Sequence, residues 1–326
     1  MDTRAVRMSW KVYVLNFGDV ACPQIGNRGD ASRKELYLKN CAMMVLASVL
    51  FATPAMASGE KGPGAHGKAV PDSVIGAQRG KLAGSTKDQG FGPQSPRDIG
   101  SVAGQNSVTF QKAPAYARMN LCNIHFHKNA EHKGGEFTTY AGNGDGNGYQ
   151  SGYKFDGPLT PAEIAPVSTD ICPNAHGALF PGDTIEVHYV YSTARVKPGP
   201  TLGACLNESI RNPQLRVEAQ VYVLVNDKNA QNFGKLVEHG EVDGFQQARN
   251  IPSNTGEPVQ YAGSTTGPSY NEKGSPFQVS WSVRPKVAKV DIATVGVWCK
   301  GNVFQEDHAH GVRNLVRNPE LLSKIH

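Results

Sequence analysis

The sequence of 326 residues predicts a mainly β protein with a single folded domain and few helices. Short apolar alternations, rich in β-branched and aromatic residues, recur along the chain and are typical of strands. Long loops rich in Gly and Asn separate them, for example AGNGDGNGYQSG at 141–152. Amphipathic helical patterns are few, and no segment repeats. The pattern favours one β domain that carries its chemistry on strands and loops.

Residues 40–53 form an apolar run that follows basic residues and precedes Ala55, Met56 and Ala57. This order is typical of a secretory signal peptide, and the run is too short for a comfortable membrane span. A signal peptide normally begins a chain, so the polar stretch ahead of it points to a start site assigned too far upstream. We therefore expect a leader over 1–57, cleavage near Ala57, and a periplasmic or secreted protein.

Residues 58–90 are rich in Gly, Lys, Pro and Ser and show little periodicity. This composition predicts a flexible tether, followed by a folded domain over 91–326. No later segment is apolar enough to span a membrane. No basic run stands out in a chain of formal net charge +5, so nucleic acid is not an expected partner.

Segments with the alternation of strands follow one another along the domain: 123–127, 183–192, 215–225, 277–285 and 290–298. The best helical pattern is the tail VRNLVRNPELLSKI at 312–325. Four cysteines lie beyond the leader: Cys122, Cys172, Cys205 and Cys299. In an oxidising compartment they predict two disulfides, with three pairings open. A zinc site made of all four is the alternative, but the chain has no CxxC pair.

The stretch NIHFHKNAEH at 123–132 concentrates histidine on one predicted strand. There His125 and His127 project from one face, and Phe126 is buried on the other. Two imidazoles that converge on one side favour a divalent metal. A pair of partly exposed strand histidines is the alternative.

A third histidine lies in IEVHYVYS, where Glu186, His188 and Val190 share one face of a predicted strand. A carboxylate two residues before a histidine can accept the second N–H of an imidazole and fix its tautomer. Asn123 stands in the same relation to His125. Three histidines with such partners and no fourth protein ligand leave one position open, which is the arrangement of catalytic zinc.

These motifs resemble those of the carbonic anhydrases. In the alpha class, a strand HFH gives two zinc ligands, SEH a gating Glu, and ELHLVHW the third His; this chain reads NIHFH, AEH and IEVHYVYS. In the same order, its segments GPQSPRDI (92–99), GSTTGP (263–268) and FQVSWSVRP (277–285) resemble QSPIDI, LTTPP and VTWIVLKEP. The gap from QSP to HFH is shorter than in the alpha class, and the second and third His are further apart. These spacings, with CNIHFHKNAEHKGGEF and PGDTIEVHYVYS, resemble the delta class.

The resemblance implies a central, largely antiparallel sheet with few short helices. It implies a hydro-lyase that reversibly hydrates carbon dioxide to bicarbonate and a proton, through attack of zinc-bound hydroxide. The implied Zn²⁺ ligands are His125, His127 and His188. Carbon dioxide, bicarbonate and water are the implied partners, and the sequence indicates no oligomeric state.

The resemblance also assigns roles around the metal. Asn123 and Glu186 orient ligands, and Glu131 accepts the hydroxyl hydrogen of Thr265, which orients the hydroxide; Thr266 is the alternative to Thr265. The implied apolar wall for carbon dioxide consists of Val190, Val279 and Trp281.

Two other functions remain open. A cupin-type metalloenzyme fits HxHxxxE, with Glu131 as a ligand, but its second motif expects Asn where this chain has Ser192. A non-catalytic exported zinc-binding protein is disfavoured because all three His, Glu131 and a Thr pair are present. Metal analysis and a hydration assay separate these functions.

The remaining histidines have no assigned catalytic role. Residues 100–122, where the alpha class carries its proton-relay histidine, contain none, so the relay is undetermined, with His176 and His239 as candidates. We interpret His308 and His310, in EDHAH, as part of an exposed acidic loop.

Overall fold

The computed structural model describes residues 68–95, 98–101, 104–264, 274–275, 277–313 and 316–325. The predicted leader lies outside these residues. Within them, no helix combines the length and apolar character needed to cross a membrane.

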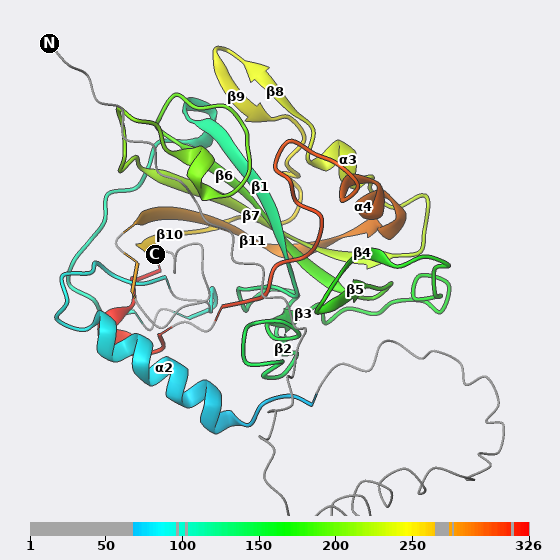
Figure 1. Cartoon of the computed structure of the whole chain (residues 1–326), viewed down its shortest axis with the longest axis horizontal. Helices are drawn as coiled ribbons and strands as arrows, with labels where there is room; N and C mark the ends of the chain where they lie inside the picture. Colours follow the sequence, from blue (N-terminus) through cyan, green and yellow to red (C-terminus); the bar gives the residue numbers. More distant parts are fainter. Residues whose placement is uncertain are drawn as a thin grey trace, which may run out of the picture. The chain divides into compact units, whose positions relative to one another are not determined.

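A five-stranded mixed sheet organises the domain in the order β1-β6-β7-β11-β10 (Figure 1). Its strands are β1 (Asn120–Lys128), β6 (Thr184–Ser192), β7 (Leu215–Val225), β10 (Val259–Ser264) and β11 (Gln278–Asp291). Three neighbouring pairs are antiparallel, and β11 pairs in parallel with β7. The prediction of a mainly β domain around a largely antiparallel sheet is confirmed.

The two faces of the sheet have different roles. On one face, Phe126 of β1 packs against the rings of Phe233 and Trp298, and Ile185, Val187 and Tyr189 of β6 join the same core cluster. Phe233 and Trp298 belong to α3 (Phe233–Leu236) and α4 (Ile292–Trp298). Val190 of β6 belongs to a second cluster, on the face that also holds the histidines. The predicted alternation of both strands is therefore confirmed.

Short elements surround the sheet. Three hairpins pair β2 (Thr139–Tyr140) with β3 (Tyr153–Lys154), β4 (Ile171–Asn174) with β5 (Gly177–Leu179), and β8 (His239–Val242) with β9 (Phe245–Ala248). The 3-10 helices are η1 (Tyr116–Arg118), η2 (Leu202–Cys205) and η3 (Pro319–Leu321).

Two disulfides join distant parts of the described chain. Cys122 of β1 bonds to Cys205 of η2, and Cys172 of β4 bonds to Cys299, which caps α4. The prediction of two disulfides is confirmed, and one of the three open pairings is selected.

The structure differs from the expected tether at residues 72–86, which form the helix α2 (Asp72–Thr86; Figure 1). Its interior combines good helix formers, such as Arg79 and Lys81, with three glycines that disfavour a helix, and Asp72 favours its N-terminal turn. Leu82 is buried against Val316, Leu321 and Leu322 of the C-terminal segment. The helix is therefore docked on the domain.

Two other expectations are wrong. Most of the segment 290–298 is α4, because Asp291 caps the helix by accepting a hydrogen bond from the backbone N–H of Ala293. Ile292, Val295 and Trp298 are buried at helical spacing. In the tail, the only helix among the described residues is η3, and Pro319 at its start prevents a longer helix from running through it.

Candidate metal centre

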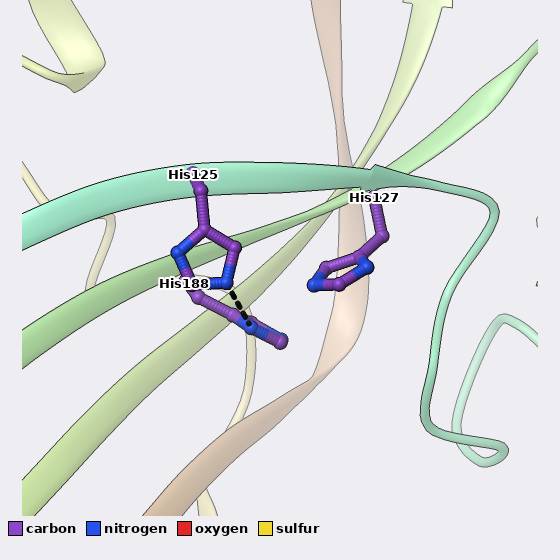
Figure 2. Close-up of side chains that lie close together, drawn as sticks. All are labelled: His125, His127 and His188. Carbon is purple, nitrogen blue, oxygen red and sulfur yellow. Dashed lines mark hydrogen bonds between the residues drawn. The ribbon is translucent and has the colours of Figure 1, made fainter. Parts of the chain in front are cut away.

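Three histidine side chains converge from two adjacent strands (Figure 2). His125 and His127 belong to β1, and His188 belongs to β6, where it lies directly opposite His125 in the antiparallel register. One nitrogen of each ring can be chosen so that all three lie within 4.8 Å of one another. The alternation of β1 and the pairing with β6 are sufficient to bring the predicted ligands together.

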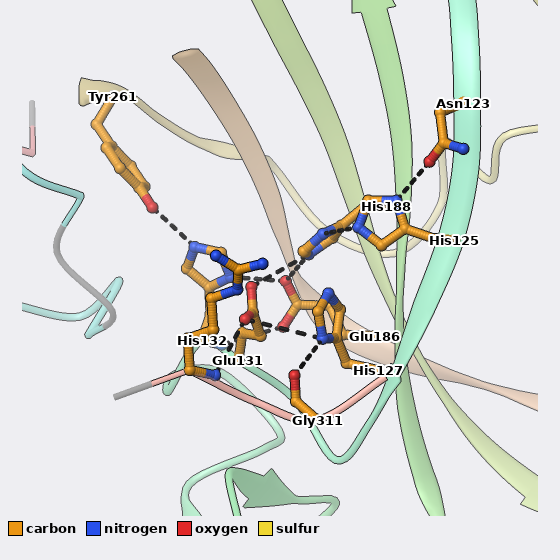
Figure 3. Close-up of polar contacts among 10 residues, drawn as sticks. Asn123, His125, His127, Glu131, His132, Glu186, His188, Tyr261 and Gly311 are labelled. Atoms are coloured by element: carbon orange, nitrogen blue, oxygen red, sulfur yellow. Dashed lines mark hydrogen bonds and ion pairs between the residues drawn. The ribbon is translucent and has the colours of Figure 1, made fainter. Parts of the chain in front are cut away.

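The other nitrogen of each ring has a hydrogen-bond acceptor. Nδ1 of His125 donates to Oδ1 of Asn123 at 2.6 Å, and Nε2 of His188 donates to Oε1 of Glu186 at 2.8 Å. Nδ1 of His127 donates to the backbone carbonyl of Gly311 at 2.9 Å. Asn123 cannot be reversed without loss, because its amide nitrogen donates to the carbonyl of Gly199. Both predicted orienting contacts are present in the structure (Figure 3).

These contacts determine which nitrogens face the centre. Because His125 donates through Nδ1 and His188 through Nε2, their remaining nitrogens carry lone pairs in the neutral rings. Those atoms, Nε2 of His125 and Nδ1 of His188, face each other at 3.2 Å. Two lone pairs at this distance repel unless a cation lies between or beside them. The donor set therefore fits a metal that prefers imidazole nitrogen, such as Zn²⁺.

Burial and neighbouring charges keep the rings of His125 and His127 neutral, as metal binding requires. Burial and the neighbouring His188 hold the pKa of His125 well below its ordinary value. Burial lowers the pKa of His127 to about 3, although the charge of Glu131 acts in the opposite direction. His125 and His127 are therefore unprotonated near neutral pH.

Glu186 is the centre of a buried network that holds His188 (Figure 3). Its Oε1 accepts hydrogen bonds from Nε2 of His188 and from Nδ1 of His132, and its Oε2 accepts from the backbone N–H of His132. Nε2 of His132 then accepts from the hydroxyl of Tyr261. Burial alone would raise the pKa of Glu186, but these contacts with His132 and His188 hold it well below its ordinary value. Glu186 is therefore a carboxylate.

A C-terminal segment, Glu306–Arg313, completes the site. The ring of His310 lies 5.6 Å from that of His125 and 5.8 Å from that of His127, between centroids. Its backbone N–H donates to the carbonyl of Phe126, and its carbonyl accepts from the N–H of Lys128. The side chain of His310 is 41% exposed and pairs with Glu306, as expected of an exposed acidic loop, but its backbone pairs with β1, which was not expected. The HxH pattern was visible in the sequence, but nothing there connected it to β1.

A small cavity of about 50 Å³ lies beside the three histidines. The residues predicted for an apolar wall, Val190, Val279 and Trp281, all line it. Glu131, Arg313 and three apolar residues that the sequence did not indicate also line it: Leu202, Leu215 and Val217. The cavity is thus apolar on one side and lined by imidazoles and charged side chains on the other.

Glu131 lies close to the three histidines without belonging to their candidate metal cluster. Its Oε1 is 3.8 Å from Nδ1 of His127, and its Oε2 is 4.0 Å from Nε2 of His188. These ring nitrogens face away from the centre, so a ligand role of the cupin type does not fit. Thr265 and Thr266 lie outside the described residues.

Neither relay candidate named from the sequence lines the cavity. His176 stacks on Tyr149 and lies 3.5 Å from Asp145, and His239 lies near Phe304. The described part of the structure assigns no proton role to either.

The sequence model of the delta carbonic anhydrases matches residues 116–294, which is more than half of the chain. The chain belongs to the delta carbonic anhydrase family. Carbon dioxide hydration is the activity of carbonic anhydrases, and the histidines of β1 and β6 lie within the matched region. No curated protein sequence matches this delta carbonic anhydrase.

Solved carbonic anhydrases resemble this delta carbonic anhydrase at low identity. The alpha-carbonic anhydrase of Thermovibrio ammonificans, in complex with the inhibitor sulfanilamide, is 18% identical over 72% of this chain and 86% of its own, with a TM-score of 0.25. The alpha-carbonic anhydrase of Photobacterium profundum is 16% identical over 74% and 93%, with a TM-score of 0.26. A halotolerant carbonic anhydrase from Dunaliella salina is 15% identical over 74% and 89%, with a TM-score of 0.29.

Proposed function

We propose that this delta carbonic anhydrase interconverts carbon dioxide and bicarbonate with one Zn²⁺ held by His125, His127 and His188. The observation that carries the proposal is the pair of facing lone pairs on His125 and His188, 3.2 Å apart in rings whose other nitrogens already donate. Zinc in such a site supplies Lewis acidity, which yields a nucleophile from water near neutral pH.

Other residues of the chain orient the imidazole rings, bind carbon dioxide and form the gate. Asn123, Glu186 and the carbonyl of Gly311 fix the ring orientations and make the imidazoles more basic ligands. Val190, Val279 and Trp281 hold carbon dioxide, because an apolar wall favours this uncharged molecule over water. Glu131 acts as the gate that accepts a hydroxyl hydrogen from Thr265, or from Thr266 in its place.

The test is carbon dioxide hydration measured beside metal analysis, on the form 58–326 that we propose to be mature. Wild type should hold about one zinc per chain, and His127→Ala and His188→Ala should lose both stoichiometric zinc and hydration, because two imidazoles hold zinc far more weakly than three. His176→Ala is the matched control and should keep both. Full zinc and full rate in either ligand variant would reject the ligand set. Zinc without hydration in wild type would instead indicate a non-catalytic zinc-binding protein.

We also propose that the protein is exported after cleavage near Ala57. The two disulfides support an oxidising compartment. N-terminal sequencing of the protein recovered from a cell fraction tests this: a first residue near Ser58 is expected, and a retained residue 1 contradicts cleavage.

A further inference from the structure

A cationic side chain lines the metal cavity, and no sequence pattern indicates it. Arg313 contributes to the cavity beside His125, His127 and His188. After burial and the neighbouring imidazoles, its charge is a further cause of the lowered pKa of His125. The guanidinium is therefore close enough to act on a group bound at the histidines.

Arg313 is held in place through its backbone. Its N–H donates to Oε1 of Glu131 at 3.3 Å. The N–H of Val312 donates to the carbonyl of Gly148 at 2.9 Å, and the carbonyl of Gly311 accepts from His127. Three successive residues are thus held by hydrogen bonds, two of them to residues that line the cavity, and the side chain of Arg313 starts from a fixed position.

The charges around the cavity indicate a role for Arg313 in the binding of an anion. The carboxylate of Glu131 lines the same cavity and repels an anion, whereas it has little effect on carbon dioxide. Bicarbonate is an anion and carbon dioxide is uncharged. A cation held beside the histidines therefore attracts bicarbonate and has little effect on carbon dioxide. Guanidinium also suits a planar anion with two oxygen acceptors, because its N–H groups form a fixed fork.

We propose that Arg313 is an anion-binding residue of the metal cavity, which holds bicarbonate and offsets the repulsion from Glu131. The proposal rests on the proposed function of the same site. It assigns Arg313 to the recognition of bicarbonate and gives it no part in the binding of carbon dioxide or of zinc.

The equilibrium constant of the reaction ties kcat/KM for hydration to kcat/KM for dehydration, so the affinity for bicarbonate is the discriminating measurement. We would load the protein with Co²⁺ and follow its visible absorption during titration with bicarbonate. Arg313→Gln should raise the bicarbonate Kd about tenfold, equivalent to about 1.4 kcal/mol. Arg313→Lys, which keeps the charge, should stay within about threefold of wild type, because it loses only the forked geometry.

Arg317→Gln is the matched control, since it removes one positive charge four residues further along the chain, at an exposed residue that does not line the cavity. It should leave the bicarbonate Kd unchanged. Arg313→Met provides a second uncharged variant if Arg313→Gln does not fold. A rise of less than about threefold in a folded, metal-loaded Arg313→Gln or Arg313→Met overturns this inference alone. Failure of the wild type to hold metal at the three histidines, or to hydrate carbon dioxide, overturns the proposed function instead.

Discussion

The ring of His127 donates a hydrogen bond of 2.9 Å to the backbone carbonyl of Gly311, 184 residues further along the chain. The same C-terminal segment places His310 beside His125 and ties the N–H of Arg313 to Glu131. Backbone groups of this segment therefore help to position the side chains of the site. Their contribution can be tested through the backbone position of Gly311.

Gly311→Ala should weaken zinc binding. A Cβ at this position would lie 2.9 Å from the backbone carbon of Gly148 and 3.1 Å from the nitrogen of Tyr149, so the chain must shift. The shift would move the carbonyl that orients His127, and loss of such a contact typically costs about 10–100-fold in metal affinity. Competition with a chelator gives the zinc Kd. Gly301→Ala is the control, because nothing lies within 4 Å of its added Cβ. Equal zinc affinities in the two variants would contradict a role for this carbonyl.

Glu186→Gln should weaken both the metal site and the fold. Glu186 accepts from three donors, whereas an amide has one accepting oxygen and turns its own NH₂ toward a donor. At least one buried donor is left unpaired, at a cost of about 1–3 kcal/mol. We expect a lower free energy of unfolding by urea titration and a zinc Kd raised about tenfold or more. The exposed Glu208→Gln should change neither quantity.

Glu131→Gln should keep its zinc and lose rate. Glu131 is 4% exposed and lies beside the ligands without belonging to the ligand cluster. By analogy with the loss of one polar catalytic contact, hydration should fall about 10–1,000-fold. Metal analysis and stopped-flow hydration check both parts. A variant with wild-type rate would remove Glu131 from the proposed gate.

Removal of the Cys122–Cys205 disulfide should affect activity as well as stability. This bridge holds η2, which carries Leu202 into the cavity wall, whereas Cys172–Cys299 joins β4 to the end of α4 on the opposite face. Replacement of either pair by Ser should cost about 2–5 kcal/mol of unfolding free energy. Only the Cys122/Cys205 variant should lower kcat/KM, measured well below both melting temperatures. An equal loss of kcat/KM in both variants would show that η2 has no special role.

Asp156 should give the domain a pH-dependent stability. Burial alone would raise its pKa, but hydrogen bonds from the hydroxyl and backbone N–H groups of Thr138 and Thr139 outweigh this and lower it from 3.8. A carboxylate with a lowered folded pKa stabilises above its unfolded pKa, and the contribution disappears as pH falls through the folded pKa. Because Asp156 is exposed, we expect only about 1 kcal/mol.

Melting curves of Asp156→Asn and wild type between pH 7 and pH 2 check this prediction. The difference in Tm should be constant above about pH 5 and should vanish near the acid end. The exposed Asp170→Asn is the control and should follow wild type throughout. A difference that grows on acidification would reverse the predicted sign.

Side-chain alternation made the central sheet and the convergence of the three histidines predictable. In β1 and β6 it separates Phe126 and Val187 from His125 and His188, so the sequence shows which residues share a face. The same reasoning failed at α4, because its β-branched residues favour a strand and only the cap at Asp291 indicates otherwise. A local sequence pattern predicts a strand reliably where the alternation of side chains is clear and no helix-capping residue precedes the segment.

The position of the C-terminal segment Glu306–Arg313 beside β1 could not be predicted in this way. Gly311 acts through its carbonyl, which every residue carries, so no side chain marks its role. His310 reaches β1 through backbone hydrogen bonds, and the pairing of Cys122 with Cys205 depends on where η2 lies. Each of these features is set by tertiary arrangement.

His125 and His188 contact each other although 63 residues separate them. Most of that length is the connection between β1 and β6, which contributes no strand to the central sheet. Closing a loop costs free energy that grows only with the logarithm of its length, about 0.6 kcal/mol for each doubling. The strand register, which places His125 opposite His188, does not depend on that length. Insertions can therefore accumulate in this connection while His125 and His188 keep their relative position. The number of residues between the two histidine motifs thus reflects the length of a loop and is independent of how the two histidines are arranged.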